Sequence, residues 1–280
     1  MTLRDFEKLT ATLKSSPVMP VLFTSHGSPM DIVLPLNATP FFQSLYQTGE
    51  LIRSKYEVKA ILVVSAHWCT KGTFVNINPQ QETIYDYYNF PPEYYVEKYP
   101  APGAPGVAKE VAQLLPAAQE TTEWGLDHGS WPMLKHLFPE ANVPVFEMSI
   151  DYYRPAQYHF DLAKQLRSLR EKGVLIIGSG SVVHNLRQAV PKLLRGDKTP
   201  YGWEEEFDHW LKARLEDRDV QALVDYEKHP LGLTAAPTPD HYVPMIYSLA
   251  MMENADAILH THEETLPAFS NRSFLIGRVN

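Results

Sequence analysis

The chain has 280 residues, of which 44% are hydrophobic and 21% are charged, and its formal net charge is −8. This composition is that of an ordinary globular protein with a sizeable buried core. The acidic balance and the lack of a basic cluster argue against nucleic acid or an anionic membrane surface as a partner. No apolar run approaches the roughly 18 residues that a transmembrane helix needs, so we expect a soluble protein.

The single cysteine, Cys69, excludes an internal disulfide and a multi-thiolate metal site within the chain. Residues 1–17 mix charged and apolar side chains, which predicts a short amphipathic surface helix and not a signal peptide. These features lead us to expect a cytoplasmic protein. Because the chain shows neither internal repeats nor a linker, we expect residues 1–280 to form one domain. The oligomeric state does not follow from the sequence.

Strand-like and helix-like segments alternate along the chain. In order, we expect a strand at 21–23, a helix over 40–55, a strand at 60–64, helices over 105–115 and after Ser130, a strand at 143–150, a helix over 156–171, a strand at 174–177, helices over 203–215 and from about 240 to 252, and a closing strand at 272–279. This alternation predicts an α/β fold: a single domain with a central, mostly parallel sheet flanked by helices.

The segment from Tyr85 to Gly103 is irregular because four prolines interrupt it, and it also holds six tyrosines. Tyrosine offers a flat apolar face with a hydrogen-bonding tip. The segment can therefore wall a pocket for an aromatic ligand, or it can be a rigid surface loop pinned by aromatic packing.

Three histidines follow strand-like runs and lie in or beside small polar turns: His26, His67 and His184. In an open parallel sheet, the carboxyl ends of the strands form the ligand crevice. Neutral imidazole is a common metal ligand, and histidine is the natural proton carrier near neutral pH. The sequence therefore predicts a metal site at the strand carboxyl ends, with an acid/base histidine beside it.

Two more histidines precede predicted helices. His128 lies in the glycine-containing turn 125–129, and His241 follows Asp240 at an expected helix start. We assign structural or exposed roles to the remaining six, although His260 and His262 have the spacing of one strand face and are a weaker alternative metal pair. These six are His136, His159, His209, His229, His260 and His262.

Six motifs occur in a fixed order between about residues 20 and 250. They are Ser25-His26-Gly27-Ser28-Pro29, Ser65-Ala66-His67-Trp68, Tyr85-Asp86-Tyr87-Tyr88-Asn89-Phe90-Pro91, Leu126-Asp127-His128-Gly129-Ser130-Trp131, Gly178-Ser179-Gly180 with His184-Asn185-Leu186, and Pro237-Thr238-Pro239-Asp240-His241. Together they resemble the class III, LigB-type, extradiol ring-cleavage dioxygenases, and within these the 4,5-DOPA dioxygenase branch.

The resemblance implies a mononuclear non-haem iron(II) enzyme that opens the ring of a catechol, or DOPA-like, substrate with molecular oxygen. It implies metal ligation by His26 and His67, an acid/base role for His184, and contact of His128 with substrate or oxygen. The third ligand implied is His241. Asp240 is the alternative, because iron(II) oxygenases commonly use two histidines and one carboxylate.

The sequence leaves the role of His184 open, and it departs from the family pattern near His241. His184 is alternatively a further metal ligand. Members of the branch often have His-Pro-Thr where this chain has Ala236-Pro237-Thr238, which weakens the match around His241.

The same imidazoles suit zinc, because a three-ligand zinc site with an open position activates water. A zinc-dependent hydrolase is therefore the chemical alternative, and zinc is also an alternative occupant of an iron site. A non-catalytic binding protein on the same fold is the third reading. Two proton-carrying histidines beside the metal candidates, His128 and His184, favour the dioxygenase. The catechol and the ring bond that is cut do not follow from the sequence.

Overall fold

The computed structural model describes residues 18–35 and 38–278, so the helix expected at residues 1–17 lies outside the described residues. The strands are Val21–Thr24 (β1), Ala60–Thr70 (β2), Thr73–Asn76 (β3), Ala118–Thr121 (β4), Val145–Asp151 (β5), Val174–Ser179 (β6), Asp256–His262 (β7), Thr265–Leu266 (β8), Phe269–Ser270 (β9) and Ser273–Arg278 (β10). The helices are Pro40–Lys55 (α2), Pro105–Leu114 (α3), Trp131–Leu137 (α4), Ala156–Ala163 (α5), Leu186–Leu194 (α6), Trp203–Glu216 (α7), Val220–Val224 (α8), Gly232–Ala235 (α9) and Val243–Ala250 (α10), with short 3-10 helices at 29–31, 92–95, 164–172 and 226–228.

Eight strands form one mixed sheet in the order β4-β3-β5-β2-β6-β1-β10-β7. The central strands β5, β2, β6 and β1 are all parallel, whereas β10 and β7 add an antiparallel edge and β3 pairs antiparallel with β5. The expected single α/β domain with a mostly parallel sheet is confirmed. The carboxyl ends of β2, β6 and β1 are neighbours, which places the turns that follow them at one edge.

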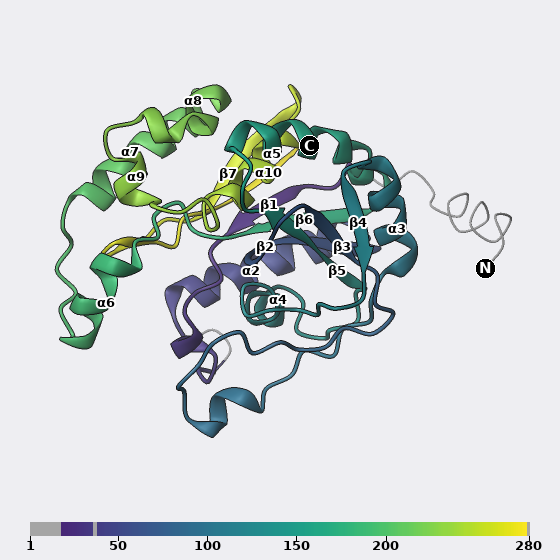
Figure 1. Ribbon diagram of the computed structural model, residues 1–280, viewed down its shortest axis with the longest axis horizontal. Coiled ribbons are helices and arrows are strands. Elements are labelled where there is room, and N and C mark those ends of the chain that lie inside the picture. Colours follow the sequence, from purple (N-terminus) through teal and green to yellow (C-terminus); the bar gives the residue numbers. More distant parts are fainter. Residues whose placement is uncertain (1–17, 36–37, 279–280) are drawn as a thin grey trace, which may run out of the picture.

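Both faces of the sheet are covered. Side chains of the central strands alternate between two apolar clusters, so that Leu62 and Ile176 lie in one and Ile61 and Leu175 in the other. The helices α3, α5 and α10 supply the first cluster, and α2 and α4 supply the second. Figure 1 shows this layering, with α6 to α9 projecting to one side of the sheet. Burial on both faces explains the continuous apolar runs of the central strands.

The predicted elements agree with the structure in type, and most differ by a few residues at their ends. The helix expected over 156–171 ends at Ala163 and continues as a 3-10 helix over 164–172. The strand expected to end near Val64 continues to Thr70 through a shift in its pairing with β5 between Val64 and Cys69. His67 therefore lies within β2 and not in a turn after it. The strands β3 and β4 and the helix α6 have no counterpart in the prediction.

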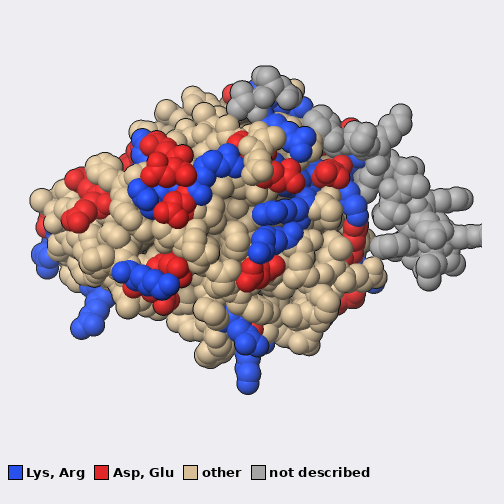
Figure 2. Space-filling view, turned by 90° about the horizontal axis from the view of Figure 1, so that it is seen from above, with Lys and Arg blue, Asp and Glu red and all other residues tan. Residues whose placement is uncertain are grey.

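The surface carries charges of both signs. Figure 2 shows Lys and Arg side chains next to Asp and Glu side chains on the face it presents. Among residues 18–35 and 38–278, no helix is both long enough and apolar enough to cross a membrane.

The ion pair between Arg170 and Asp256 is buried completely. Arg170 donates from Nη1 and Nη2 to the Asp256 carboxylate at 2.7 and 2.9 Å, and from Nε to the Met19 carbonyl at 2.7 Å. Burial alone raises the pKa of Asp256, but the hydrogen bonds from Arg170 and the Glu253 backbone lower it below its ordinary value. The pair joins the 3-10 helix at 164–172 to the start of β7 and to the chain entering β1.

We predict that Asp256→Ala lowers the free energy of unfolding by about 3–5 kcal/mol, because it leaves a buried guanidinium without its partner. Urea titration measures this change. Asp161→Ala is the matched control: its pair with Lys164 is exposed, so its removal changes the stability by less than about 1 kcal/mol. Because the pKa of Asp256 is lowered in the folded state, its contribution is present above about pH 4 and is lost as the pH falls through the folded pKa. Equal effects of the two substitutions would contradict the assignment.

Candidate metal centre

The strand register brings His26 and His67 together. Ser179, the last residue of β6, pairs with Thr24 of β1 on one side and with Ser65 of β2 on the other. His26 and His67 each lie two residues beyond these partners. Their Nε2 atoms are 3.1 Å apart, and the Ser179 hydroxyl lies 3.1 Å from His26 Nδ1. The three central strands therefore bring the Nε2 atoms of two imidazoles together at the carboxyl edge, with the rings in an edge-on arrangement.

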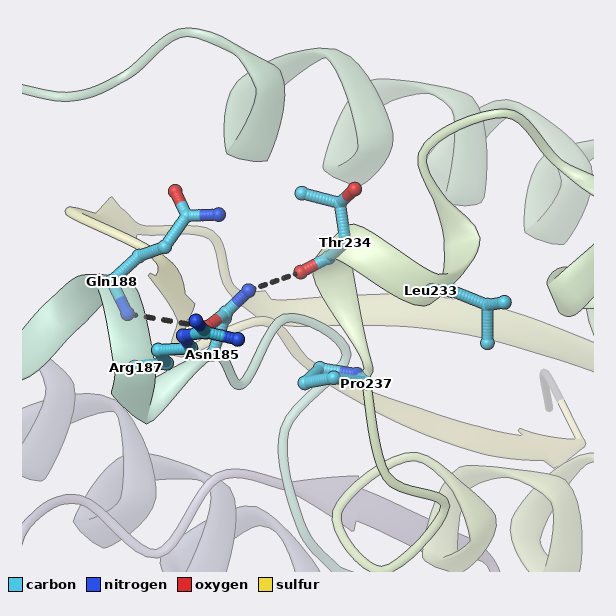
Figure 3. Close-up of a pocket in the computed structure, with 6 residues that line it drawn as sticks. All are labelled: Asn185, Arg187, Gln188, Leu233, Thr234 and Pro237. Atoms are coloured by element: carbon cyan, nitrogen blue, oxygen red, sulfur yellow. Dashed lines mark hydrogen bonds between the residues drawn. The ribbon is translucent and has the colours of Figure 1, made fainter.

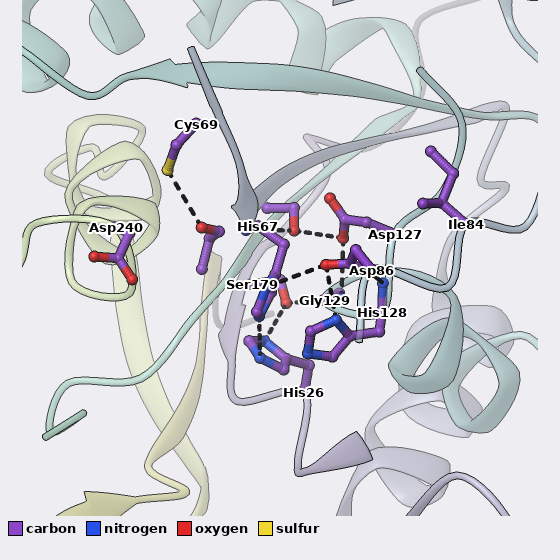
Figure 4. A network of polar contacts seen from close by, with 12 residues as sticks. His26, His67, Cys69, Ile84, Asp86, Asp127, His128, Gly129, Ser179 and Asp240 are labelled. Carbon is purple, nitrogen blue, oxygen red and sulfur yellow. Dashed lines mark hydrogen bonds and ion pairs between the residues drawn. The ribbon is translucent and has the colours of Figure 1, made fainter. Parts of the chain in front are cut away.

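Asp86 orients two of the imidazoles. Its Oδ2 lies 3.3 Å from His67 Nδ1 and 2.8 Å from His128 Nδ1, and its Oδ1 accepts the His128 backbone N–H at 2.8 Å. A carboxylate at Nδ1 favours the tautomer whose other nitrogen, Nε2, carries a lone pair. Figure 4 shows Asp86 between these two imidazoles, with His26 on the other side of His67.

His241 and His184 complete the crevice. Their rings are stacked with centroids 3.4 Å apart, and Asp240 accepts a hydrogen bond from His241 Nδ1. The His241 ring centroid is 5.4 Å from that of His26 and 5.0 Å from that of His67. Gly180 permits this approach, because a Cβ there would lie 2.2 Å from the His241 carbonyl oxygen. All five histidines expected at the site therefore lie together.

Burial keeps most of these imidazoles neutral. It is the largest cause that lowers the pKa of His26 and His241 well below the ordinary value, and it lowers the pKa of His128 and brings that of His184 to about 4. Burial acts in the same direction on His67, but the hydrogen bond to Asp86 and nearby carboxylates outweigh it and raise the pKa of His67. Neutral imidazoles present the lone pairs that a metal ion or a substrate proton needs.

A buried carboxyl pair supports the turn that carries His128. Trp124 Nε1 lies 3.3 Å from Asp127 Oδ2 and 3.2 Å from Glu147 Oε2, and the Asp127 backbone N–H donates to Glu147 Oε1. Asp127 also accepts from the Ser65 hydroxyl at 2.7 Å and the Gly129 N–H at 3.0 Å. Burial is the largest cause that raises the pKa of Asp127, and it raises that of Glu147 well above its ordinary value.

The donor set fits a divalent metal ion. For a metal–imidazole bond of about 2.1 Å, two ligands at right angles lie about 3.0 Å apart, close to the distance between the His26 and His67 Nε2 atoms. His241 Nε2 is buried and has no hydrogen-bond partner among the described residues. Potential ligand atoms of His26, His67 and His128 lie within 4.8 Å of one another, as do those of His184, Asp240 and His241.

Other candidates lie outside this set. His260 and His262 belong to neither of the two groups of potential ligands found in the described part of the chain. Burial raises the pKa of the Cys69 thiol to about 12, so this side chain stays protonated near the site.

Sequence analysis named Asp240 but not three other carboxyl groups near the histidines: Asp86, Asp127 and Glu147. Asp86 contacts His67 and His128, and Glu147 contacts Trp124 and Asp127, all of which are distant in sequence, so no spacing rule links them. Asp127 lies three residues from Trp124, a spacing that by itself indicates no site. A carboxylate among tyrosines was the available signal for Asp86.

The tyrosine-rich segment is pinned by aromatic packing, one of the two alternatives expected from the sequence. The Tyr87 ring packs against Tyr85 and Tyr95 and is 5% exposed, as expected for aromatic packing. Its edge also meets the His128 ring, with centroids 5.6 Å apart. One tyrosine of the segment therefore borders the histidine cluster, whereas Tyr88 is 79% exposed.

The fold and the cluster together define an α/β protein with a histidine-rich centre at its strand carboxyl ends, and comparison with known proteins agrees. The sequence profile of the catalytic LigB subunit of aromatic ring-opening dioxygenase matches residues 20–272. A 4,5-DOPA dioxygenase extradiol from Escherichia coli K12 is 39% identical over 252 residues, 88% of this chain and 90% of that protein. One from Beta vulgaris is 36% identical over 244 residues, 85% of this chain and 88% of that protein.

A crystal structure of an uncharacterized Escherichia coli K12 protein superimposes with a TM-score of 0.79 at 35% identity, covering 92% of this chain and all of that one. The chain therefore belongs to the LigB family of aromatic ring-opening dioxygenases. The expected enzyme class, an extradiol aromatic ring-opening oxidoreductase, is confirmed by these relatives.

We predict that Glu147→Gln makes stability less sensitive to alkaline pH. The raised pKa keeps Glu147 protonated in the folded state, whereas the unfolded chain ionises near 4.5, so the free energy of unfolding falls as the pH rises between these values. Glutamine does not ionise, so the variant lacks this decrease in the free energy of unfolding. The difference between the variant and the wild type should grow as the pH rises above about 5, by at most about 1.4 kcal/mol per pH unit.

Urea titrations at several pH values measure the difference, and Glu120→Gln at an exposed position is the control. Parallel pH curves for Glu147→Gln and the wild type would show that Glu147 is ionised in the folded protein.

Proposed function

We propose that this chain is an iron(II)-dependent extradiol dioxygenase that opens the ring of a catechol, or DOPA-like, substrate with molecular oxygen. The observation that carries the proposal is the convergence of five histidines, two of which bring their Nε2 atoms to 3.1 Å. The relatives named 4,5-DOPA dioxygenase extradiol support the same substrate class.

In this proposal His26, His67 and His241 hold the metal ion through Nε2. Asp240 is then the partner that orients His241, because its carboxylate accepts from His241 Nδ1. The buried, unpartnered Nε2 of His241 supports this choice over Asp240 as the third ligand. A bound iron(II) ion with three protein ligands supplies open positions for both catechol oxygens and for dioxygen.

His184 is the acid/base residue of the proposal. Its lowered pKa, about 4, keeps its imidazole neutral at pH 7 and able to accept a hydroxyl proton as the catechol binds. Stacking against His241 holds the ring beside the ligands. The imidazole nitrogen that accepts this proton returns a proton to the substrate later in the reaction. His128, fixed through Asp86, directs its Nε2 toward substrate or oxygen.

Zinc is the alternative metal for the same imidazoles, and it would support hydrolysis by lowering the pKa of bound water. Non-catalytic binding is the second alternative. Membership of the ring-opening family favours iron and oxygen chemistry over both. The proposal includes one domain over residues 1–280. The single cysteine supports a cytoplasmic enzyme, and the net charge of −8 argues against nucleic acid or an anionic membrane surface as a partner.

Oxygen uptake tests the proposal. After anaerobic loading with iron(II), we expect the protein to consume oxygen with L-DOPA or simple catechols and to form a yellow ring-opened semialdehyde. Protein loaded with zinc is the control and should consume none. If the iron-loaded protein is inactive with every catechol, the proposal fails, and assays of ester and amide hydrolysis then separate the two alternatives.

We predict that His184→Ala lowers kcat by about 10²–10⁴-fold, the usual contribution of a positioned acid/base group, while the iron content stays near that of the wild type. Elemental analysis measures the iron in the same samples that are assayed. Loss of iron from the variant would instead make His184 a metal ligand.

A further inference from the structure

A pocket of about 470 Å³ lies between the start of α6 and the region of α9. Figure 3 shows Asn185, Arg187 and Gln188 on one side of this α6–α9 pocket, and Leu233, Thr234 and Pro237 on the other. Its volume is within the range of small-molecule sites. The metal proposal does not use any of these six residues.

The α6–α9 pocket begins one residue after His184 in the chain. Asn185 directly follows His184, and its side chain donates to the Thr234 carbonyl at 2.7 Å. The His184 backbone N–H donates to Ala235 at 2.8 Å, so both walls are tied to the residue that stacks on His241. The pocket is therefore built on the two segments that flank the candidate centre, residues 184–188 and 233–237.

The pocket carries one charge, and it is positive. Arg187 lies in its wall, and none of the six lining residues is acidic. Among the described residues, no carboxylate forms an ion pair with the Arg187 guanidinium, whereas Arg170 and Arg272 are each paired with a buried carboxylate. Guanidinium stays protonated and binds carboxylates with two parallel hydrogen bonds.

We propose that Arg187 binds a carboxylate on the side chain of the substrate, so that the enzyme selects catechols with an anionic substituent. This inference rests on the proposed dioxygenase function. It assigns recognition to the carboxylate alone, because the pocket offers no acidic partner to an ammonium group. A dihydroxyphenylpropionate should therefore be a good substrate without any amino group, and dopamine a poor one.

The test compares kcat/KM for 3-(3,4-dihydroxyphenyl)propionate, dopamine and 4-methylcatechol in the iron-loaded protein. In the wild type, we expect the propionate to exceed dopamine by at least about 10-fold. In Arg187→Met, the ratio of propionate to 4-methylcatechol should fall by about 10- to 100-fold, mainly through KM, because a charged hydrogen bond is lost. Arg195→Met, an arginine just after α6, is the control and should keep the wild-type ratio.

Calorimetry gives a second readout that does not depend on turnover. 3-Phenylpropionate should bind the wild type more tightly than phenethylamine does, and Arg187→Met should lose this difference. If 4-methylcatechol is cleaved but the propionate and dopamine are equivalent, or if Arg187→Met keeps both preferences, the role of Arg187 is refuted and the dioxygenase proposal stands. If no catechol is cleaved, the proposed function fails and the role of Arg187 fails with it.

Discussion

The approach of His26 and His67 is the constraint on which the candidate centre depends. Ser179 pairs with Thr24 of β1 and Ser65 of β2, and each histidine follows its strand's partner by two residues. Their Nε2 atoms meet at 3.1 Å because this register is set by a central strand that is buried on both faces. A slip of one residue in the pairing of β2 would turn His67 to the other face of the sheet, so the strand register determines the geometry of the site.

The buried carboxylates around the site have separate roles. Asp86 is partnered by two imidazoles, which lower its pKa despite burial and keep it ionised. Glu147 contacts Trp124 and Asp127 and has no cationic partner among the described residues, and burial raises its pKa well above the ordinary value. The carboxylate that contacts two imidazoles is therefore charged, and the carboxyl group that supports the His128 turn is neutral. Unpaired buried charge is costly, and this arrangement avoids it.

Apolar periodicity predicted the fold class and the central strands, and position after strand-like runs predicted His26, His67 and His184, because both are local signals. The site roles of His128 and His241 came from the resemblance to the LigB-type dioxygenases. The sequence did not predict Asp86 as the partner of two histidines, since that contact joins segments 19 and 42 residues apart, as the positions of His67, Asp86 and His128 show. The extension of β2 through His67 depends on a local shift in pairing with β5, which the sequence does not display. The α6–α9 pocket likewise arises from tertiary packing, which the sequence does not display.

The central claim is that His26, His67 and His241 hold one metal ion. Anaerobic titration with iron(II), followed by calorimetry and elemental analysis, tests it most directly when the wild type is compared with His241→Ala and Asp240→Asn. We expect one iron per wild-type chain, loss of most of that iron in His241→Ala, and weaker but measurable binding in Asp240→Asn, because the loss of a partner behind a ligand reduces metal affinity by about 10- to 100-fold. Full iron occupancy in His241→Ala would contradict the account and move the third ligand to Asp240 or His128.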